Sequence, residues 1–274
     1  MLQRLYDSLV TTTMFIGMHA VLFIMAERIW PANTEQKRWR RGVILDVFYS
    51  YFGVFLMTVV SLSWIGVAVD AMKKSNAVGA PLTKLHDFVG GLSFLVALVL
   101  AVVVADFAGY WKHRLMHTKL LWPFHAVHHS SEEVDFFSNE RNHPLETVLA
   151  NLLQLAPLLL LGFPPGVIGI AAAIRYSHSV YEHTNLRFSY GPLSYLFVSP
   201  SFHRWHHSSD HDVIDKNYAN VFSFWDWAFG TYHVPSDRPS PNAYGIPEFP
   251  KSFVGQVVQP FRDLVSVLRG VERR

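Results

Sequence analysis

Eight of the fifteen histidines in this 274-residue chain lie in three short clusters, and these clusters set the strongest constraint on its fold. One cluster is an H-x-x-x-H pair, and the other two are H-x-x-H-H triads. They comprise His113, His117, His125, His128, His129, His203, His206 and His207. Residues three or four apart lie on one helical face, so we expect the three rings of each triad to converge on one point. A chain that joins all three clusters must bring them to the same side of the molecule.

Eight imidazoles are too many for a single metal ion, because a first-row metal offers roughly four to six positions. The sequence therefore predicts two metal ions in one histidine cage. A lone H-x-x-x-H is more often a pair of unrelated helix histidines than a site, and a lone H-x-x-H-H is less easily dismissed. Three such clusters in one apolar chain favour the metal site.

The composition favours a membrane protein, since hydrophobic residues make up 50% and charged residues 16% of the chain. There is no cysteine, which excludes disulfides and thiolate metal ligands. A net charge of +2 and the lack of a long basic run argue against nucleic-acid binding. The apolar N-terminal stretch has no small-residue cleavage site, so we interpret it as a membrane helix rather than a signal peptide.

Three apolar stretches are long enough to cross a bilayer as helices, namely Leu5–Ala26, Val43–Val69 and Phe88–Phe107. A fourth, Thr147–Ile174, is interrupted by Pro157 and by the Gly-Phe-Pro-Pro sequence at Gly162–Pro165. A single crossing there would leave the two triads on opposite sides of the bilayer. We therefore expect a helical hairpin, with both ends on one face and the tip buried inside the bilayer.

The sequence thus predicts an all-α, polytopic integral membrane protein with a histidine-lined di-metal helical cap. Residues 1–87 hold two N-terminal spans, and 88–234 form a histidine-box catalytic domain with the third span and a hairpin at 145–180. Residues 235–274 form a cytoplasmic tail, in which Ser252–Val271 has the spacing of an amphipathic surface helix that Pro260 bends or begins. Five basic residues follow the first span and three follow the second, which places the histidine clusters in the cytoplasm.

The three clusters, with their flanks, resemble the histidine boxes of the membrane fatty acid hydroxylase and sterol desaturase superfamily. The boxes read D-F-A-G-Y-W-K-H-R-L-M-H, F-H-A-V-H-H-S and F-H-R-W-H-H-S, and the flanks R-N-H-P-L-E, E-H-T-N-L and D-K-N-Y-A-N-V-F-S-F-W-D-W-A-F-G-T-Y agree as well. The resemblance covers residues 88–234, about half of the chain. One departure is Ala219, where the family often has glycine, and it affects loop shape more than chemistry.

The resemblance implies a non-haem di-iron oxidoreductase that uses O₂ to hydroxylate an unactivated C–H bond of a fatty acyl, sterol or related lipid. Desaturation by the same site is the alternative. Imidazole alone does not select iron, since it also binds zinc, copper and nickel. No flavin or nicotinamide fingerprint is present, so the electrons must come from an external donor, either a ferredoxin or a cytochrome b5-type protein with its reductase. A bacterial inner membrane is favoured over the endoplasmic reticulum.

Several further residues are candidates for the site. His183, in E-H-T-N, matches an additional ligand of the family, whereas His178 is either a ligand or a packing residue. Asp106, Glu182 and Asp215 are expected to accept hydrogen bonds from the outer ring N–H groups, or else to be ordinary surface or capping carboxylates. Asn217 either binds a metal-bound water or caps a turn, so Asp106 and Asn217 are the candidate catalytic residues besides the ligands.

Four more residues near these motifs have structural interpretations. Arg141 and His143 are expected to support the second cluster without ligating, and His211 and His233 are expected to be solvated. Two other functional classes remain open. A histidine-lined metal transporter would need histidines within its spans, where His19 alone lies well inside. A non-catalytic scaffold is disfavoured because all three clusters are intact.

Overall fold

The computed structural model of the chain describes residues 2–37, 39–60, 76–236 and 240–271. Within these residues, extended pairing is limited to two isolated bridges, between Pro31 and Leu186 and between Ser208 and Tyr244. Everything else is helix, turn or irregular chain. The predicted all-α fold is therefore confirmed.

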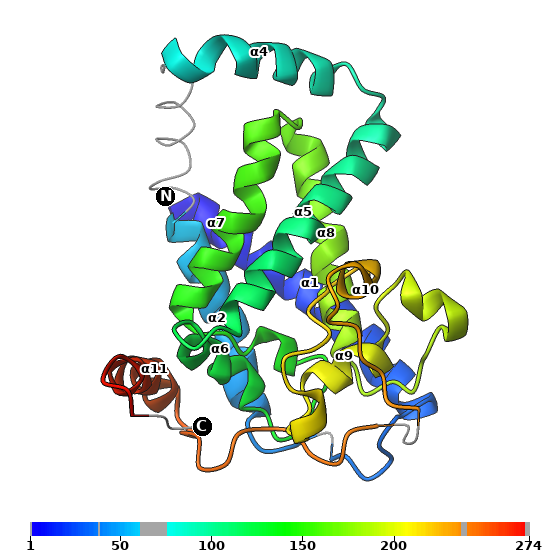
Figure 1. Ribbon diagram of the computed structural model, residues 1–274, viewed down its shortest axis with the longest axis vertical. Coiled ribbons are helices and arrows are strands. Elements are labelled where there is room, and N and C mark those ends of the chain that lie inside the picture. The colour runs from blue at the N-terminus through cyan, green and yellow to red at the C-terminus, as the bar shows by residue number, and fades with distance from the viewer. Residues whose placement is uncertain (1, 38, 61–75, 237–239, 272–274) are drawn as a thin grey trace.

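Figure 1 shows a bundle of long helices with short helices gathered at one end. The helices are α1 (Leu2–Ile29), α2 (Val43–Val60), α4 (Asn76–Gly90), α5 (Phe94–Met116), α6 (Trp122–His129), α7 (Pro144–Leu161), α8 (Pro165–Glu182), α9 (Pro200–His206), α10 (Phe224–Ala228) and α11 (Phe253–Leu268). Helix α5 packs most extensively on α7 and α8, and α1 packs on α2. Small residues on α5 and α8, among them Ala101, Ala105 and Ala171, let these helices approach closely.

Among the described residues, four helices are long and apolar enough to cross a bilayer, at Leu9–Ile29, Val43–Val60, Phe94–Met116 and Pro144–Leu161. Large apolar side chains point outward from them. Met14 is 71% exposed, Val21 65% and Leu95 68%. Such exposure suits contact with lipid and would be costly in water. The last part of the predicted second span, residues 61–69, lies outside the described residues.

The third span differs from the prediction in both of its limits. Helix α4 begins before the predicted third span and includes its first residues, and it lies across one end of the bundle (Figure 1). A break at residues 91–93 separates α4 from α5, and α5 then continues to Met116 rather than ending at Phe107. The hydropathy of the sequence falls after Phe107 because the polar residues of the first box point inward from the same helix.

Helices α7 and α8 form the predicted hairpin. Gly162 ends α7 with φ +81°, a left-handed conformation that favours glycine, and Pro165 begins α8. The tip contacts α4, since the His86 ring bonds the carbonyl of Leu160 and Phe163 belongs to the same apolar cluster as Val89. Burial of the tip inside the bilayer stays a prediction. Each leg has 18 residues, a length of about 27 Å at ~1.5 Å per residue. The hairpin thus reaches the level where α5 begins.

A buried network of charges ties the start of α2 to the segment between α6 and α7. The Asp46 carboxylate accepts hydrogen bonds of 2.6 Å from Arg40 and from Arg141. Arg40 also donates to Asp135 at 2.6 Å, and all four side chains are buried. Arg141 is thus structural, as predicted, and it stabilises the chain just after the second box.

Helix α11 packs beside α6 and α2 at the end where the histidines lie. His143 caps the start of α7 through its ring and bonds the carbonyl of Val257, while Tyr49 donates to Gln256 at 3.0 Å. Pro260 lies buried inside α11 and neither begins nor interrupts it. The outer face exposes an apolar stripe, as predicted for an amphipathic helix, formed by Val254, Val258, Phe261, Val265 and Leu268.

Candidate metal centre

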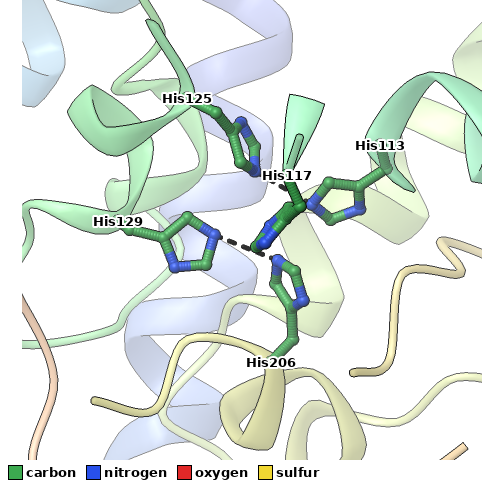
Figure 2. A group of neighbouring side chains, drawn as sticks. All are labelled: His113, His117, His125, His129 and His206. Carbon is green, nitrogen blue, oxygen red and sulfur yellow. Dashed lines mark hydrogen bonds between the residues drawn. The ribbon is translucent and has the colours of Figure 1, made fainter. Parts of the chain in front are cut away.

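Nine histidines gather in two neighbouring groups at the end of the bundle. Group 1 consists of His113, His117, His125, His129 and His206 (Figure 2), and group 2 of His128, His183, His203 and His207. Within each group, one ring nitrogen of every member lies within 4.8 Å of all the others. The structure therefore brings together all eight histidines of the clusters and adds His183.

The two H-x-x-H-H triads do not converge as expected, because each is divided between the groups. In α6 the i,i+4 pair His125 and His129 joins group 1, while His128 joins group 2. In the third cluster the i,i+4 pair belongs to group 2 and the middle histidine, His206, to group 1. A helix turns by about 100° per residue, so adjacent histidines diverge while those four apart align. The triads thereby interlock the two groups.

Helix ends and their caps set the positions of the clustered histidines. His113 lies in the last turn of α5 and His117 is its C-cap, while His183 is the C-cap of α8. Pro200 begins α9, and the Ser199 side chain accepts a hydrogen bond from the amide of Phe202. Four helix ends thus place imidazoles around one region.

The distances between ring nitrogens fit metal coordination. In group 2 the Nε2 atoms of His183, His203 and His207 are pairwise 3.1 Å apart, and His128 Nε2 is also 3.1 Å from that of His183. Group 1 has two such pairs at 3.0 Å. Two ligand atoms at right angles around a metal, each at ~2.1 Å, are about 3.0 Å apart. Neutral imidazole lone pairs at this distance repel one another, and a shared cation removes the repulsion.

The outer nitrogens of four rings are held by main-chain carbonyls. The Nδ1–H groups of His113 and His206 donate to Tyr218 and Lys216, both at 2.8 Å, and those of His128 and His183 donate at 3.1 and 2.7 Å. A proton on Nδ1 leaves the Nε2 lone pair free to bind a metal. His117 Nε2, which points into group 1, is buried and has no hydrogen-bond partner among the described residues. The residues present therefore fit a metal pair.

Carboxylates hold two further rings by hydrogen bonds, and a third carboxylate lies near another ring. His125 Nδ1 donates to Glu146 at 2.8 Å and His117 Nδ1 to Asp215 at 3.0 Å. His203 Nδ1 lies 3.8 Å from Glu182. Asp215 thus has its predicted contact, and Glu182 lies near its ring at a longer distance. The contact of Glu146 with a histidine ring was not predicted, although Glu146 is the last residue of the R-N-H-P-L-E flank. The distance in sequence between Glu146 and the second box does not show that α7 folds back against α6.

Asp106 and Asn217 both form hydrogen bonds away from the histidine rings, and Asn217 follows the predicted turn-capping alternative. Asp106 accepts hydrogen bonds from the amides of Val221 and Phe222, both at 3.0 Å, and from the Trp225 indole at 3.2 Å. It therefore anchors the loop before α10 to α5 rather than a histidine ring. Asn217, at φ +59°, donates to the carbonyl of His233 and accepts from its amide, so it holds a turn.

Besides His86 and His143, four histidines lie apart from the two groups. His178 is outside both of them, and its Nδ1 is 3.8 Å from Glu182. His19 is a packed residue, as expected, with ring contacts to Phe15 and Ser177. His211 is exposed, in agreement with its predicted solvation, and His233 is partly buried.

Burial favours the neutral form of seven of the clustered histidines. It lowers the pKa of His117 and of His183 to about 4. The pKa values of five others are well below the usual range, again chiefly because of burial, namely His128, His129, His203, His206 and His207. Neutral imidazole is the form that ligates a metal, so near neutral pH these rings bind without competition from protons.

A cavity of about 690 Å³ leads from the membrane helices to the histidines. Its walls come from α1, α2, α5, α7 and α8, and its end is lined by both groups through His113, His125, His128, His183 and His203. On the other side of group 1, Asp215 exposes 58% of its side chain. The site thus lies between an internal cavity and the solvent.

We expect Glu146→Gln to lower metal affinity about 10- to 100-fold while leaving the fold intact. The substitution keeps the size of the side chain but removes the charge that faces His125 and Lys112. Competition with a chelator measures the affinity. Glu140→Gln is a matched control, because Glu140 bonds Asn139 and Tyr176 instead of a histidine. Equal affinities in the two variants would contradict this role of Glu146.

Comparison with known proteins relates this geometry to a family. Residues 98–231 match the family model described as fatty acid hydroxylase. The chain is 38% identical over 166 residues to the ornithine lipid hydroxylase OlsE of Rhizobium tropici, covering 60% of this chain and 50% of that protein. Alkylglycerol monooxygenase of Homo sapiens is 32% identical over 168 residues, covering 61% and 36%.

A very-long-chain aldehyde decarbonylase, GL1-11 of Oryza sativa subsp. japonica, is 30% identical over 149 residues, covering 53% of this chain and 54% of that protein. The chain therefore spans about half or less of the length of these curated relatives. No solved structure gives a significant match. The family match covers all three histidine boxes, and on this basis the chain belongs to the membrane fatty acid hydroxylase superfamily.

Proposed function

We propose that this protein is an O₂-dependent, non-haem di-iron hydroxylase that inserts a hydroxyl group at an unactivated C–H bond of a lipid. The observation that carries the proposal is the pair of interlocked histidine groups at the end of a cavity enclosed by membrane helices. Two of the relatives are named as a lipid hydroxylase and a monooxygenase, and these names support the same reaction class.

Iron is the metal that the donor set and the resemblance to the family favour. Group 1 offers five imidazoles, more than the four ligands at which structural zinc saturates. The chain has no cysteine to favour soft metals. With two electrons and two protons, the bound iron pair and O₂ would convert C–H to C–OH and release the second oxygen atom as water.

The protein's own residues would position the reactants and exclude water. The cavity-lining histidines of both groups face any lipid that enters between the helices. Glu146, Asp215 and four main-chain carbonyls keep the rings aligned, which limits rearrangement during turnover. Burial around the rings keeps bulk solvent away from the reacting carbon.

We further propose an orientation and an electron donor. The excess of basic residues between α1 and α2 supports a cytoplasmic location of the histidine end, and the rhizobial relative supports a bacterial inner membrane. The missing flavin and nicotinamide fingerprints support an external donor, a ferredoxin or a cytochrome b5-type protein with its reductase. Labelling of single cysteines introduced at Glu132 and Ser209, both of which are exposed, reads the orientation directly in intact cells.

The test is turnover of the full chain in vesicles of bacterial lipid, with ferrous iron, a ferredoxin and its reductase, under isotopically heavy O₂. We expect a lipid product that carries one heavy oxygen atom and that forms only with the electron donor present. The double variant His128→Ala/His206→Ala, with one substitution in each group, is the inactive control. An unsaturated product without heavy oxygen would instead assign desaturation, and oxidation equal to that of the control would refute the proposal.

A further inference from the structure

An arginine lines the cavity inside the membrane region. Arg175, on α8, precedes Glu182 by seven residues, which places it about 10 Å from the histidine end along the helix axis. Its side chain is 9% exposed, and it donates to Gln154 of α7 at 2.5 Å. Gly109 of α5 leaves the room for this side chain, because a Cβ atom there would collide with the guanidinium. Three helices therefore meet around Arg175 and Gln154, which we call the polar pair.

The polar pair is not explained by helix packing alone. A charged side chain at this depth is costly in a bilayer, on the order of 2.5–3.5 kcal/mol on insertion scales, and commonly marks a functional site. Arg175 forms an ion pair with Asp106, but the 3.5 Å between Nε and the carboxylate is beyond good hydrogen-bonding distance, and Nε has no hydrogen-bond partner among the described residues. Asp106 already accepts three N–H bonds from the α10 region. The guanidinium thus retains donor capacity beside the cavity.

The polarity of the residues that line the cavity differs between the two sides of the polar pair. Between the pair and the histidines, many lining residues are polar, including Asn142, Thr147, Asn151 and Ser179. Farther from the histidines, α2, α7 and α8 contribute apolar residues, namely Met57, Leu155, Leu158, Ile168 and Ala172. A lipid that follows this gradient has its polar part beside the histidines and its chain beyond the polar pair.

We propose that Arg175 and Gln154 bind the ester-linkage oxygens of an amphiphilic lipid, so that the carbon presented to the histidines lies in the polar part of the molecule. This inference rests on the proposed function and names its substrate class. An ester carbonyl accepts hydrogen bonds from a guanidinium and from an amide, whereas a hydrocarbon at this level leaves those donors unpaired. That difference disfavours purely apolar ligands.

Binding of two probes to the purified, metal-loaded full chain tests the proposal without turnover. The probes are a lysophosphatidylglycerol and the linear hydrocarbon of the same chain length, both radiolabelled and measured in detergent. We expect Gln154→Leu to weaken binding of the lysophospholipid at least about tenfold and to leave hydrocarbon binding unchanged. Gln259→Leu is the matched control. It exchanges the same two residue types on α11, outside the cavity lining, where the Gln259 amide donates to Asp263, and it should change neither affinity by more than about twofold.

A second variant separates recognition from structure. Arg175→Lys keeps a positive charge near Asp106 but cannot reproduce the fork geometry of the guanidinium, so we expect the same selective loss of the lysophospholipid. Equal weakening of both probes would show a structural role and overturn the proposal, as would unchanged binding in Gln154→Leu. Selective binding by a protein that fails to hydroxylate lipid would refute the proposed function while leaving the polar pair as a lipid site.

Discussion

Replacing His183 with alanine is expected to lower the iron content from about two per chain to about one and to abolish lipid hydroxylation. The reason is geometric, because His183 Nε2 lies 3.1 Å from the Nε2 atoms of the other three members of group 2. Its removal leaves three imidazoles for the second metal and opens the centre of the group. Metal analysis of the purified protein, together with product formation, measures the effect.

His178→Ala is the matched control for this experiment. His178 lies five residues earlier on the same helix, is also largely buried, and is outside both groups. We expect this variant to retain both irons. Loss of one iron from His178→Ala, or full metal content in His183→Ala, would show that the ligand sphere differs from the two groups described above.

Replacing Asp46 with asparagine is expected to destabilise the protein by about 3–5 kcal/mol, the usual cost of leaving buried charges uncompensated. Asp46 is fully buried and binds Arg40 and Arg141 at 2.6 Å each. Its neutralisation leaves two buried guanidinium groups with one remaining carboxylate, that of Asp135. The free energy of unfolding in a mixed-micelle titration measures the loss. Because the carbonyl of Arg141 holds His128, iron should also dissociate faster from this variant.

Glu132→Gln supplies the comparison for this prediction. Glu132 pairs with Lys251 at the surface, where both side chains are more than half exposed, and such pairs contribute about 0–1 kcal/mol. If Asp46→Asn costs no more than Glu132→Gln, the buried network is not a major source of stability.

The spacing of the histidines predicted most of the metal centre, because spacing on a helix fixes which rings share a face. It did not predict how the triads divide. His128 belongs to group 2 although the other histidines of its triad belong to group 1, and His206 belongs to group 1 although the others of its triad belong to group 2. This division depends on how α6 and α9 face each other. The hydropathy pattern likewise predicted the spans and the hairpin but missed α4, whose sequence contains Pro81 and several polar residues.

The carboxylates were harder to predict, because their partners are distant in sequence. Asp106 precedes the first box directly, yet it bonds amides at positions 221 and 222, more than a hundred residues later. Glu146 binds a ring 21 residues away through the fold of α7 against α6. Local spacing carries no information about such contacts. Asp215 was identified because it lies close to the third box, although its partner is His117 of the first.

Four ligand rings are oriented by main-chain carbonyls at Arg141, Ser179, Lys216 and Tyr218. A peptide oxygen is present whatever the side chain, so substitutions at Ser179 or Lys216 can accumulate without turning a ring. Alanine scanning would therefore pass over these positions, and only exchange of the peptide bond itself, for example for an ester, would reveal them. Side chains at these four positions can accordingly change while the four rings keep the same hydrogen-bond acceptors.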